Sequence, residues 1–220
     1  MASALLPIPH VLPASQLAPA DSRYPPLETP CGVRFPRGRI TEIHGAASSG
    51  RTSLLYSALA QATAEGESCA LVDGENMFDP ASAAAAGVEL HRLLWIRCGG
   101  ADSQHALRVA DLLLQSGGFG LVALDLASLD ARAANRIPMS YWYRFRRAVE
   151  PTRTALVVLS PMANVRQCAS LIVEPRRVEA QWSGTPGCSQ LLDGVTLEFV
   201  TRKPAAVPVP PRYEARAMTA

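Results

Sequence analysis

The stretch GAASSGRTS, residues 45–53, constrains the fold of this chain more than any other. It follows the apolar, strand-like run RITEIHG (39–45) and precedes a helix pattern from Arg51 to Glu65. A strand, a glycine-bounded loop and a helix in this order are the setting of the phosphate-binding pattern G-x-x-x-x-G-K-[ST]. The chain departs from that pattern at one position, where Arg51 replaces the lysine. An ordinary glycine turn with a helix cap is the alternative interpretation.

The residues of this loop have distinct expected roles. Gly45 and Gly50 let backbone N–H groups turn toward an anion, and the following helix adds its partial positive charge. The Thr52 hydroxyl is expected to hold the Mg²⁺ of a bound ATP. Ser49 and Ser53 complete the predicted phosphate-binding set. The planar guanidinium of Arg51 keeps the charge of lysine but not its shape, so we expect nucleotide binding to survive and fast hydrolysis to suffer.

Two acidic residues lie at the ends of expected strands. Asp125 ends the apolar run LVALD, where a carboxylate that supports magnesium is expected; the alternative is an aspartate that caps the following turn. Glu75 follows the strand-like run 68–74, where a carboxylate could orient an attacking water, and it is the catalytic candidate. The alternative for Glu75 is a solvated loop acid.

Strand-like and helix-like runs alternate through the middle of the chain, which predicts an α/β fold. Strands are expected at 39–45, 68–74, 93–98, 119–126 and 154–161, and helices at 51–65, from Pro80 to just before Gly87, at 103–115 and after Pro138. The last third, with SLIVEP, RVEAQWS and GVTLEFVTR, is typical of strands joined by turns. We therefore expect a mostly parallel, helix-covered sheet with an antiparallel C-terminal extension.

Composition suggests one ordered domain between two tails. Residues 1–30 are expected to be a Pro/Ala-rich arm, residues 31–203 the core domain, and residues 204–220 a basic, Pro-rich flexible tail. The net charge of +2 does not by itself indicate a nucleic-acid-binding protein. The five cysteines are scattered without metal-ligand spacing, and no apolar run is long enough to span a membrane, so we expect a reduced cytoplasmic protein.

The segment SYWYRFRR (140–147) interleaves aromatic residues with arginines, which suits contact with single-stranded nucleic acid. The alternative is a helix with Trp142, Phe145 and Val149 on its core face. In that case the arginines project outward as a solvated or binding face. The candidates for contact with nucleic acid or a partner protein are Arg144, Arg146, Arg147, Arg176 and Arg177.

Taken together, GRITEI, the phosphate-binding loop, VDGE and the following DP resemble the ATPase core of the RecA recombinases. The resemblance covers about residues 30–130 well and continues more weakly to about residue 200. It implies a RecA-like P-loop core, with ATP and magnesium as cofactors and Asp79 as an adenine contact.

The departures from the recombinase pattern bear on function. Arg51 replaces the loop lysine, and Ser82 replaces the tyrosine that stacks on adenine. Ser160 and Pro161 stand where the recombinases have an Asn-Gln pair that senses the γ-phosphate. The chain leaves little room for the two DNA-binding loops of the recombinases, and we do not expect their large C-terminal domain.

A short RecA-like chain without those loops resembles the ImuA family of SOS-induced mutagenesis cassettes. This resemblance implies an adaptor in mutagenic translesion DNA synthesis and DNA repair, with little or no ATP hydrolysis. The implied partners are an ImuB-like protein, an error-prone replicative-type DNA polymerase and RecA, with single-stranded DNA as a further candidate. Two alternatives stay open: a slow RecA-like DNA-dependent ATPase, and a RecA-filament antagonist that docks through its N-terminal arm.

Overall fold

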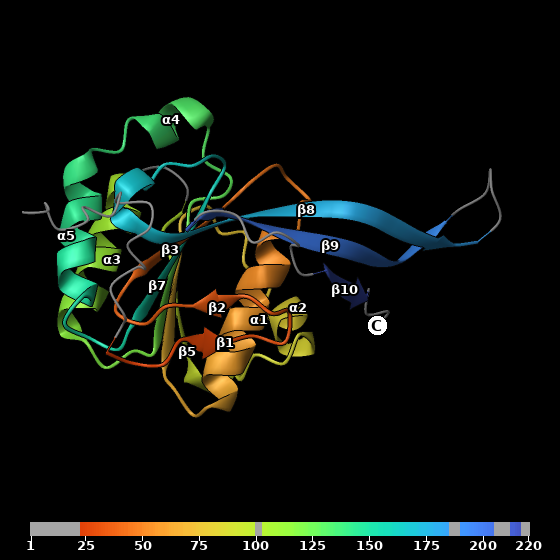
Figure 1. Cartoon of the computed structure of the whole chain (residues 1–220), viewed down its shortest axis with the longest axis horizontal. Helices are drawn as coiled ribbons and strands as arrows, with labels where there is room; N and C mark the ends of the chain where they lie inside the picture. The colour runs from red at the N-terminus through yellow and green to blue at the C-terminus, as the bar shows by residue number, and fades with distance from the viewer. Residues whose placement is uncertain (1–22, 100–102, 185–189, 205–211, 217–220) are drawn as a thin grey trace, which may run out of the picture.

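An eight-stranded sheet runs through the protein, in the order β10-β9-β8-β3-β7-β6-β4-β5. The computed structural model describes residues 23–99, 103–184, 190–204 and 212–216 (Figure 1). The parallel strands are β3 (Ile40–His44), β4 (Cys69–Asp73), β5 (Leu93–Arg97), β6 (Leu121–Asp125), β7 (Ala155–Ser160) and the first part of β8 (Ala169–Ser183). The antiparallel strands are β9 (Leu191–Lys203) and β10 (Arg212–Arg216). The predicted α/β class and its antiparallel extension are confirmed.

Helices cover both faces of the parallel strands. On one face lie α1 (Arg51–Ala64) and α2 (Pro80–Ala85), and on the other lie α3 (Ser103–Ser116) and α5 (Met139–Val149), with the short α4 (Ala131–Asn135) before α5 (Figure 1). Each face carries its own cluster of buried apolar side chains. This double cover explains why β6 and β7 consist almost entirely of apolar residues.

The C-terminal strands are longer than the sequence pattern predicts. The runs SLIVEP and RVEAQWS are expected to be separate strands, but they form the single strand β8, with irregular pairing to β9 near Arg177. The bulge lets one strand change direction without a turn. The β8–β9 pair extends beyond the helices as a projecting ribbon (Figure 1).

Both expected domain boundaries need correction. Leu27 is buried in the first core cluster, within a short hairpin of β1 (Leu27–Glu28) and β2 (Arg34–Phe35), so the core begins before residue 31. Part of the expected flexible tail, Arg212–Arg216, pairs with β9 as β10, because Tyr213 and Ala215 pack against the same apolar cluster. Residues 1–22 of the predicted arm lie outside the described residues.

The described cysteines serve mainly as small core residues. Cys31, Cys69 and Cys168 are buried and free, Cys98 is half-buried and free, and Cys188 lies outside the described residues. Among the helices of the described residues, none has the length and apolar character that a membrane crossing requires.

Candidate nucleotide site

The loop at residues 45–53 lies at the carboxyl-end edge of the parallel strands, between β3 and α1. Its path needs left-handed backbone at Ser48 (φ 57°) and at Gly50 (φ 102°), which directly precedes α1. A Cβ at Gly50 would lie 2.7 Å from a methyl carbon of Leu197 on β9. Gly50 is therefore required twice, by its backbone angle and by the strand packed against it.

The hydroxyl side chains of this loop differ in their surroundings. Ser49 is buried, and its hydroxyl has no hydrogen-bond partner among the described residues. Thr52 is exposed on the first turn of α1, and Ser53 beside it is partly exposed. A turning backbone, a helix start and an unpartnered hydroxyl together fit a phosphate group. The residues present thus fit ATP phosphates, and Thr52 and Asp125 are the residues that would hold Mg²⁺.

Arg51 does not point freely into this loop. Its Nη1 donates to the carbonyl oxygens of Ala127 (3.1 Å) and Ser160 (3.0 Å), which follow β6 and end β7. Burial lowers the pKa of Arg51, while the nearby Asp125 carboxylate acts in the opposite direction. The guanidinium therefore joins two strand ends, which a lysine ammonium would do with less geometric fit.

Two aspartates occupy matching positions at the ends of neighbouring strands. Asp73 ends β4 and pairs in register with Asp125, which ends β6. Burial raises the pKa of Asp125, and the Asp73 charge adds to this rise, whereas the Ala127 N–H and Arg51 oppose it. Asp125 Oδ1 accepts a hydrogen bond from the Ala127 N–H at 2.9 Å, so this aspartate caps the turn after β6. That contact leaves Oδ2 as the oxygen for a cation.

Asp73 is a site residue that the sequence analysis missed. Its side chain is fully buried and accepts hydrogen bonds from the Met77 N–H (3.0 Å), the Phe78 N–H (3.1 Å) and Trp95 Nε1 (3.1 Å). These bonds shape the loop that carries Glu75, the half-buried candidate catalytic residue. The sequence signal for Asp73 was an acidic residue at the end of an apolar strand. Its hydrogen-bond partners could not be identified from the sequence alone.

Asp79 caps α2, as the position of Pro80 predicts. Its carboxylate accepts hydrogen bonds from the Ala81 N–H (3.2 Å), the Ser82 N–H (3.1 Å) and the Ser82 hydroxyl. The hydrogen bonds from Ser82 lower the pKa of Asp79. Asp79 is therefore hydrogen-bonded to Ser82, the residue at the expected adenine-stacking position. The contact of Asp79 with adenine stays a prediction.

Glu42 is a second site residue that the sequence analysis missed. It is fully buried in β3, and its Oε1 accepts hydrogen bonds from the Ser160 hydroxyl (3.0 Å) and from the backbone N–H groups of Asn164 (2.5 Å) and Val165 (3.0 Å). Glu42 thus fixes the end of β7 and the loop after it. A glutamate inside the apolar run RITEIHG was the sequence signal.

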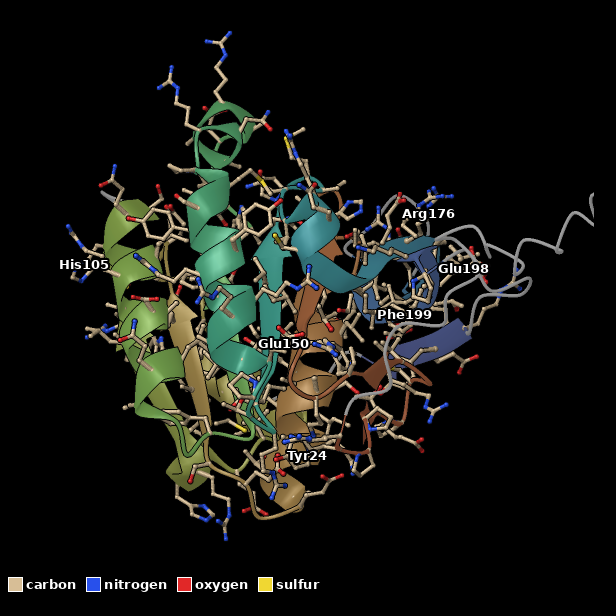
Figure 2. The ribbon with its side chains drawn as sticks, turned by 60° about the vertical axis from the view of Figure 1, so that its left-hand side comes forward. Tyr24, His105, Glu150, Arg176, Glu198 and Phe199 are labelled. Atoms are coloured by element: carbon tan, nitrogen blue, oxygen red, sulfur yellow. The ribbon has the colours of Figure 1, made fainter. Side chains whose placement is uncertain are left out.

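The candidate arginines fall into two groups. On α5, Trp142, Phe145 and Val149 are buried, which confirms the core interpretation of the aromatic residues. The α5 arginines project from that helix, and Arg144 pairs with Asp111 at 2.8 Å. Arg176 and Arg177 lie instead on β8, and Figure 2 shows Arg176 well apart from Glu150 at the end of α5. The structure does not bring the two groups together.

The fold and this loop define a P-loop α/β core of the kind found in nucleotide-binding proteins. The RecA N-terminal domain family matches residues 25–138, just over half of the chain, and the chain belongs to that family.

Curated relatives and one solved structure extend the comparison. The chain is 44% identical over 92 residues to Protein RecA of Ectopseudomonas oleovorans (41% of this chain, 26% of the relative). It is 41% identical over 109 residues to Protein RecA of Cutibacterium acnes (49% of this chain, 31% of the relative). These matches span about a quarter to a third of those proteins. The crystal structure of the RadB recombinase shares the fold, with a TM-score of 0.60 at 16% identity over 84% of this chain and 89% of that one.

Proposed function

We propose that the chain is a cytoplasmic accessory protein of SOS-induced mutagenic translesion DNA synthesis and DNA repair, with little or no ATP hydrolysis. In this role the RecA-like core acts as an adaptor for an ImuB-like protein, an error-prone replicative-type DNA polymerase and RecA. The observation that carries the proposal is the placement of Arg51, whose guanidinium is hydrogen-bonded to Ala127 and Ser160.

This placement bears on catalysis. Hydrolysis of ATP depends on positive charge placed at the transferring phosphate. A guanidinium bound to two carbonyl oxygens must give up those bonds before it can serve a phosphate, and its fork does not reproduce the compact ammonium group. Nucleotide binding through the loop backbone and Thr52 does not need that step. We therefore propose a core that holds ATP and Mg²⁺ weakly and turns ATP over poorly.

The end of β7 supports the same proposal. The resemblance places a γ-phosphate sensor at Ser160 and Pro161, but Ser160 is buried and bonded to Glu42, and proline has no side-chain donor. Because Ser160 is bonded to Glu42 and Pro161 has no donor, we propose that no side chain at this position senses the γ-phosphate. A conformational signal from nucleotide to DNA would then not begin at the end of β7.

A turnover assay tests this part of the proposal. Phosphate release from Mg-ATP would be measured with and without single-stranded DNA for the wild type, Arg51→Lys and Glu75→Gln. We expect wild-type turnover near background and no change in Glu75→Gln. Robust DNA-stimulated turnover that Glu75→Gln abolishes would contradict the proposal and favour the slow DNA-dependent ATPase, the second candidate.

The second candidate has its own supporting observation. Thr52 and Glu75 are solvent-accessible at the same sheet edge as Asp125, so the residues for a weak ATPase are present. Calorimetric titration with Mg-ATP tests this alternative, because an ATPase must bind nucleotide. Absence of binding at millimolar nucleotide would end this alternative and the proposed weak ATP binding, and would leave the adaptor role intact.

The adaptor role is tested by its partners. Co-expression with the ImuB-like protein, followed by affinity purification, should recover both chains, and RecA should bind the purified pair. Removal of residues 1–30 tests the RecA-antagonist alternative, in which the arm docks on a RecA protomer. Unchanged recovery of RecA by the shortened chain would exclude that role for the arm. Failure to recover the ImuB-like protein with the full chain would contradict the adaptor proposal.

A further inference from the structure

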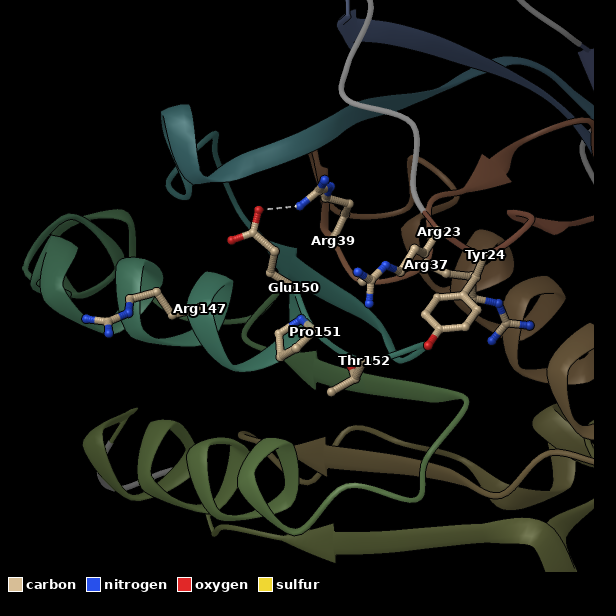
Figure 3. Close-up of a pocket in the computed structure, with 9 residues that line it drawn as sticks. Arg23, Tyr24, Arg37, Arg39, Arg147, Glu150, Pro151 and Thr152 are labelled. Carbon is tan, nitrogen blue, oxygen red and sulfur yellow. Dashed lines mark hydrogen bonds and ion pairs between the residues drawn. The ribbon is translucent and has the colours of Figure 1, made fainter.

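A pocket of about 530 Å³ opens at the amino-end edge of the sheet, away from the P-loop. Gly38 and Arg39 precede β3, and Pro151 and Thr152 precede β7, so the pocket lies where these two strands begin. Because β3 has five residues, the two edges are about 16 Å apart. Its side walls include Arg23, Tyr24, Arg37, Arg39, Arg147 and Glu150, and we call it the arginine pocket (Figure 3).

The backbone of the arginine pocket is closely fitted. Gly38 has a left-handed φ of 67°, and a Cβ there would lie 2.8 Å from the Thr152 carbonyl oxygen. The Gly38 N–H donates to the Thr154 carbonyl at 3.0 Å. These contacts join the segment before β3 to the segment before β7, so the pocket is part of the rigid core.

Two of the four arginines that line this pocket are paired with carboxylates. Glu150 accepts a hydrogen bond from Arg39 Nη1 at 2.8 Å (Figure 3). Arg37 is bound to Glu67 and Glu65 behind the wall. Arg147 is exposed on α5 and has no ion pair within the described residues.

The segment around α5 carries an excess of positive charge. Residues 130–154 contain six arginines and two acidic residues, a net charge of +4, although Arg144 and Arg153 pair with Asp111 and Glu67 outside that range. Polyanions are attracted to such a local excess even when the net charge of the protein is small.

Two exposed aromatic rings flank this charge. Tyr24 at the pocket is 37% exposed, and Tyr143 on α5 is 45% exposed. Tyr143 is four residues before Arg147, so the two side chains share one face of α5. Gln167 Nε2 donates to the Tyr143 hydroxyl at 2.8 Å, which restrains the ring at the surface. Exposed aromatic faces between guanidinium groups offer base stacking together with phosphate contact.

We propose that Tyr143, Arg147 and the arginine pocket form a binding surface for single-stranded nucleic acid, with phosphates at the arginines and bases on the tyrosines. An acidic polypeptide would use the charge but would have no use for two exposed aromatic faces. The surface excludes Arg144, which is paired with Asp111, and the distant Arg176 and Arg177. This inference rests on the proposed role in DNA synthesis and repair. Its test uses neither ATP nor partner proteins.

Salt dependence gives the first measurement. If two or three phosphates contact this surface, the logarithm of the association constant should fall with the logarithm of salt concentration with a slope of roughly −1.4 to −2. The probe is a fluorescein-labelled oligothymidine of about 20 nucleotides, and binding to the full chain is followed by anisotropy. We expect binding at low salt that weakens steeply as salt rises.

Matched variants locate the surface. Arg147→Glu should weaken binding about tenfold or more, and Tyr143→Ala or Tyr24→Ala roughly fivefold or more, because each removes a contact to phosphate or base. Arg177→Glu changes the net charge by the same amount as Arg147→Glu but lies on β8, so it should alter binding by no more than about twofold. Circular dichroism confirms that each exposed substitution leaves the fold intact.

Three outcomes would overturn the inference. One is that the oligonucleotide does not bind at low salt, and another is that Arg177→Glu weakens binding as much as Arg147→Glu. The third is that a labelled oligoglutamate peptide binds as tightly and loses affinity in Arg147→Glu but not in the tyrosine variants, which would assign the surface to acidic proteins. None of these results depends on ATP turnover or on recovery of the ImuB-like protein, so failure here is distinguishable from failure of the proposed function.

Discussion

The two edges of the same sheet use their charged residues in different ways. At the carboxyl-end edge, the groups in the expected nucleotide positions are bound by the protein itself: Arg51 by two carbonyls and Asp79 by Ser82. At the amino-end edge, Arg37 and Arg39 are also bound by carboxylates, but Arg147, which the sequence analysis named, lines the same pocket without an ion pair among the described residues. A residue in a familiar motif position therefore indicates ancestry, whereas its current partners indicate whether it still serves a ligand.

The largest expected effect on stability comes from a substitution at the amino-end edge. Arg37 has a side chain that is only 5% exposed, and its Nη1 donates to Glu67 (2.7 Å) and to the Gly120 carbonyl (2.9 Å). Arg37→Met leaves Glu67 buried with less compensation, so we expect a loss of about 3 kcal/mol in the free energy of unfolding. Urea titration followed by circular dichroism measures this loss.

A surface ion pair provides the control for Arg37. Arg34 and Glu28 form a pair at 3.1 Å in which both side chains are mostly exposed. Arg34→Met should therefore cost less than about 1 kcal/mol. Equal losses in the two variants would show that the buried ion pairs of Arg37 add no more stability than a surface pair.

The next effect concerns how tightly β9 covers the P-loop. Gly50→Ala adds a Cβ at 2.7 Å from Leu197 and forces alanine into φ 102°, so we expect a loss of roughly 2–3 kcal/mol. Gly66→Ala has a similar φ of 81° but open space around it, and should cost only about 1 kcal/mol. Unfolding titrations of the two variants separate the steric cost from the backbone cost.

A double variant checks the cause of this difference. In a Leu197→Ala background, Gly50→Ala should cost about as much as Gly66→Ala, because the obstructing methyl groups are gone. If Gly50→Ala remained equally costly there, contact with β9 would not be what confines the loop.

Much of the fold followed from local patterns in the sequence. The run from Leu54 to Ala62 repeats apolar residues at helical spacing, which predicts a helix, and the apolar residues Leu54, Leu55, Leu59 and Ala62 are all buried on α1. Pro80 and Asp79 define the start of α2 by their own backbone and side-chain chemistry. Such signals need only neighbours within a few residues, so the chain alone was sufficient.

The partners of the site residues needed the folded structure. Arg51 and Ser160 are 109 positions apart, and Glu42 and Asn164 are 122 positions apart. No local periodicity encodes contacts at such separation, so the sequence predicted Arg51 in a phosphate site but not its two carbonyl partners. The unbroken length of β8 was missed for a related reason, since its second half is stabilised by pairing with β9, which in turn pairs with β10, and not by a pattern of its own.

The smallest expected effect is the pH dependence of stability that Asp125 causes at the carboxyl-end edge. Burial raises the pKa of this carboxyl above its value in the unfolded chain, which is about 4. The folded state therefore favours the protonated form, so its contribution to stability is complete below about pH 4 and is lost as the pH rises through the higher folded pKa. Asparagine does not titrate. The unfolding free energy of the wild type minus that of Asp125→Asn should thus fall as the pH rises from about 4 and then level off.

Urea titrations of both proteins across that pH range give the difference curve. Mg-ATP should flatten the curve if the ion binds at Asp125, because a bound cation favours the ionised carboxylate. A difference that rises with pH in the absence of nucleotide would mean that Arg51 already holds Asp125 ionised. The carboxyl-end edge would then carry a formed ion pair, and the contrast would lie between one edge with its charges paired and one with an excess of positive charge.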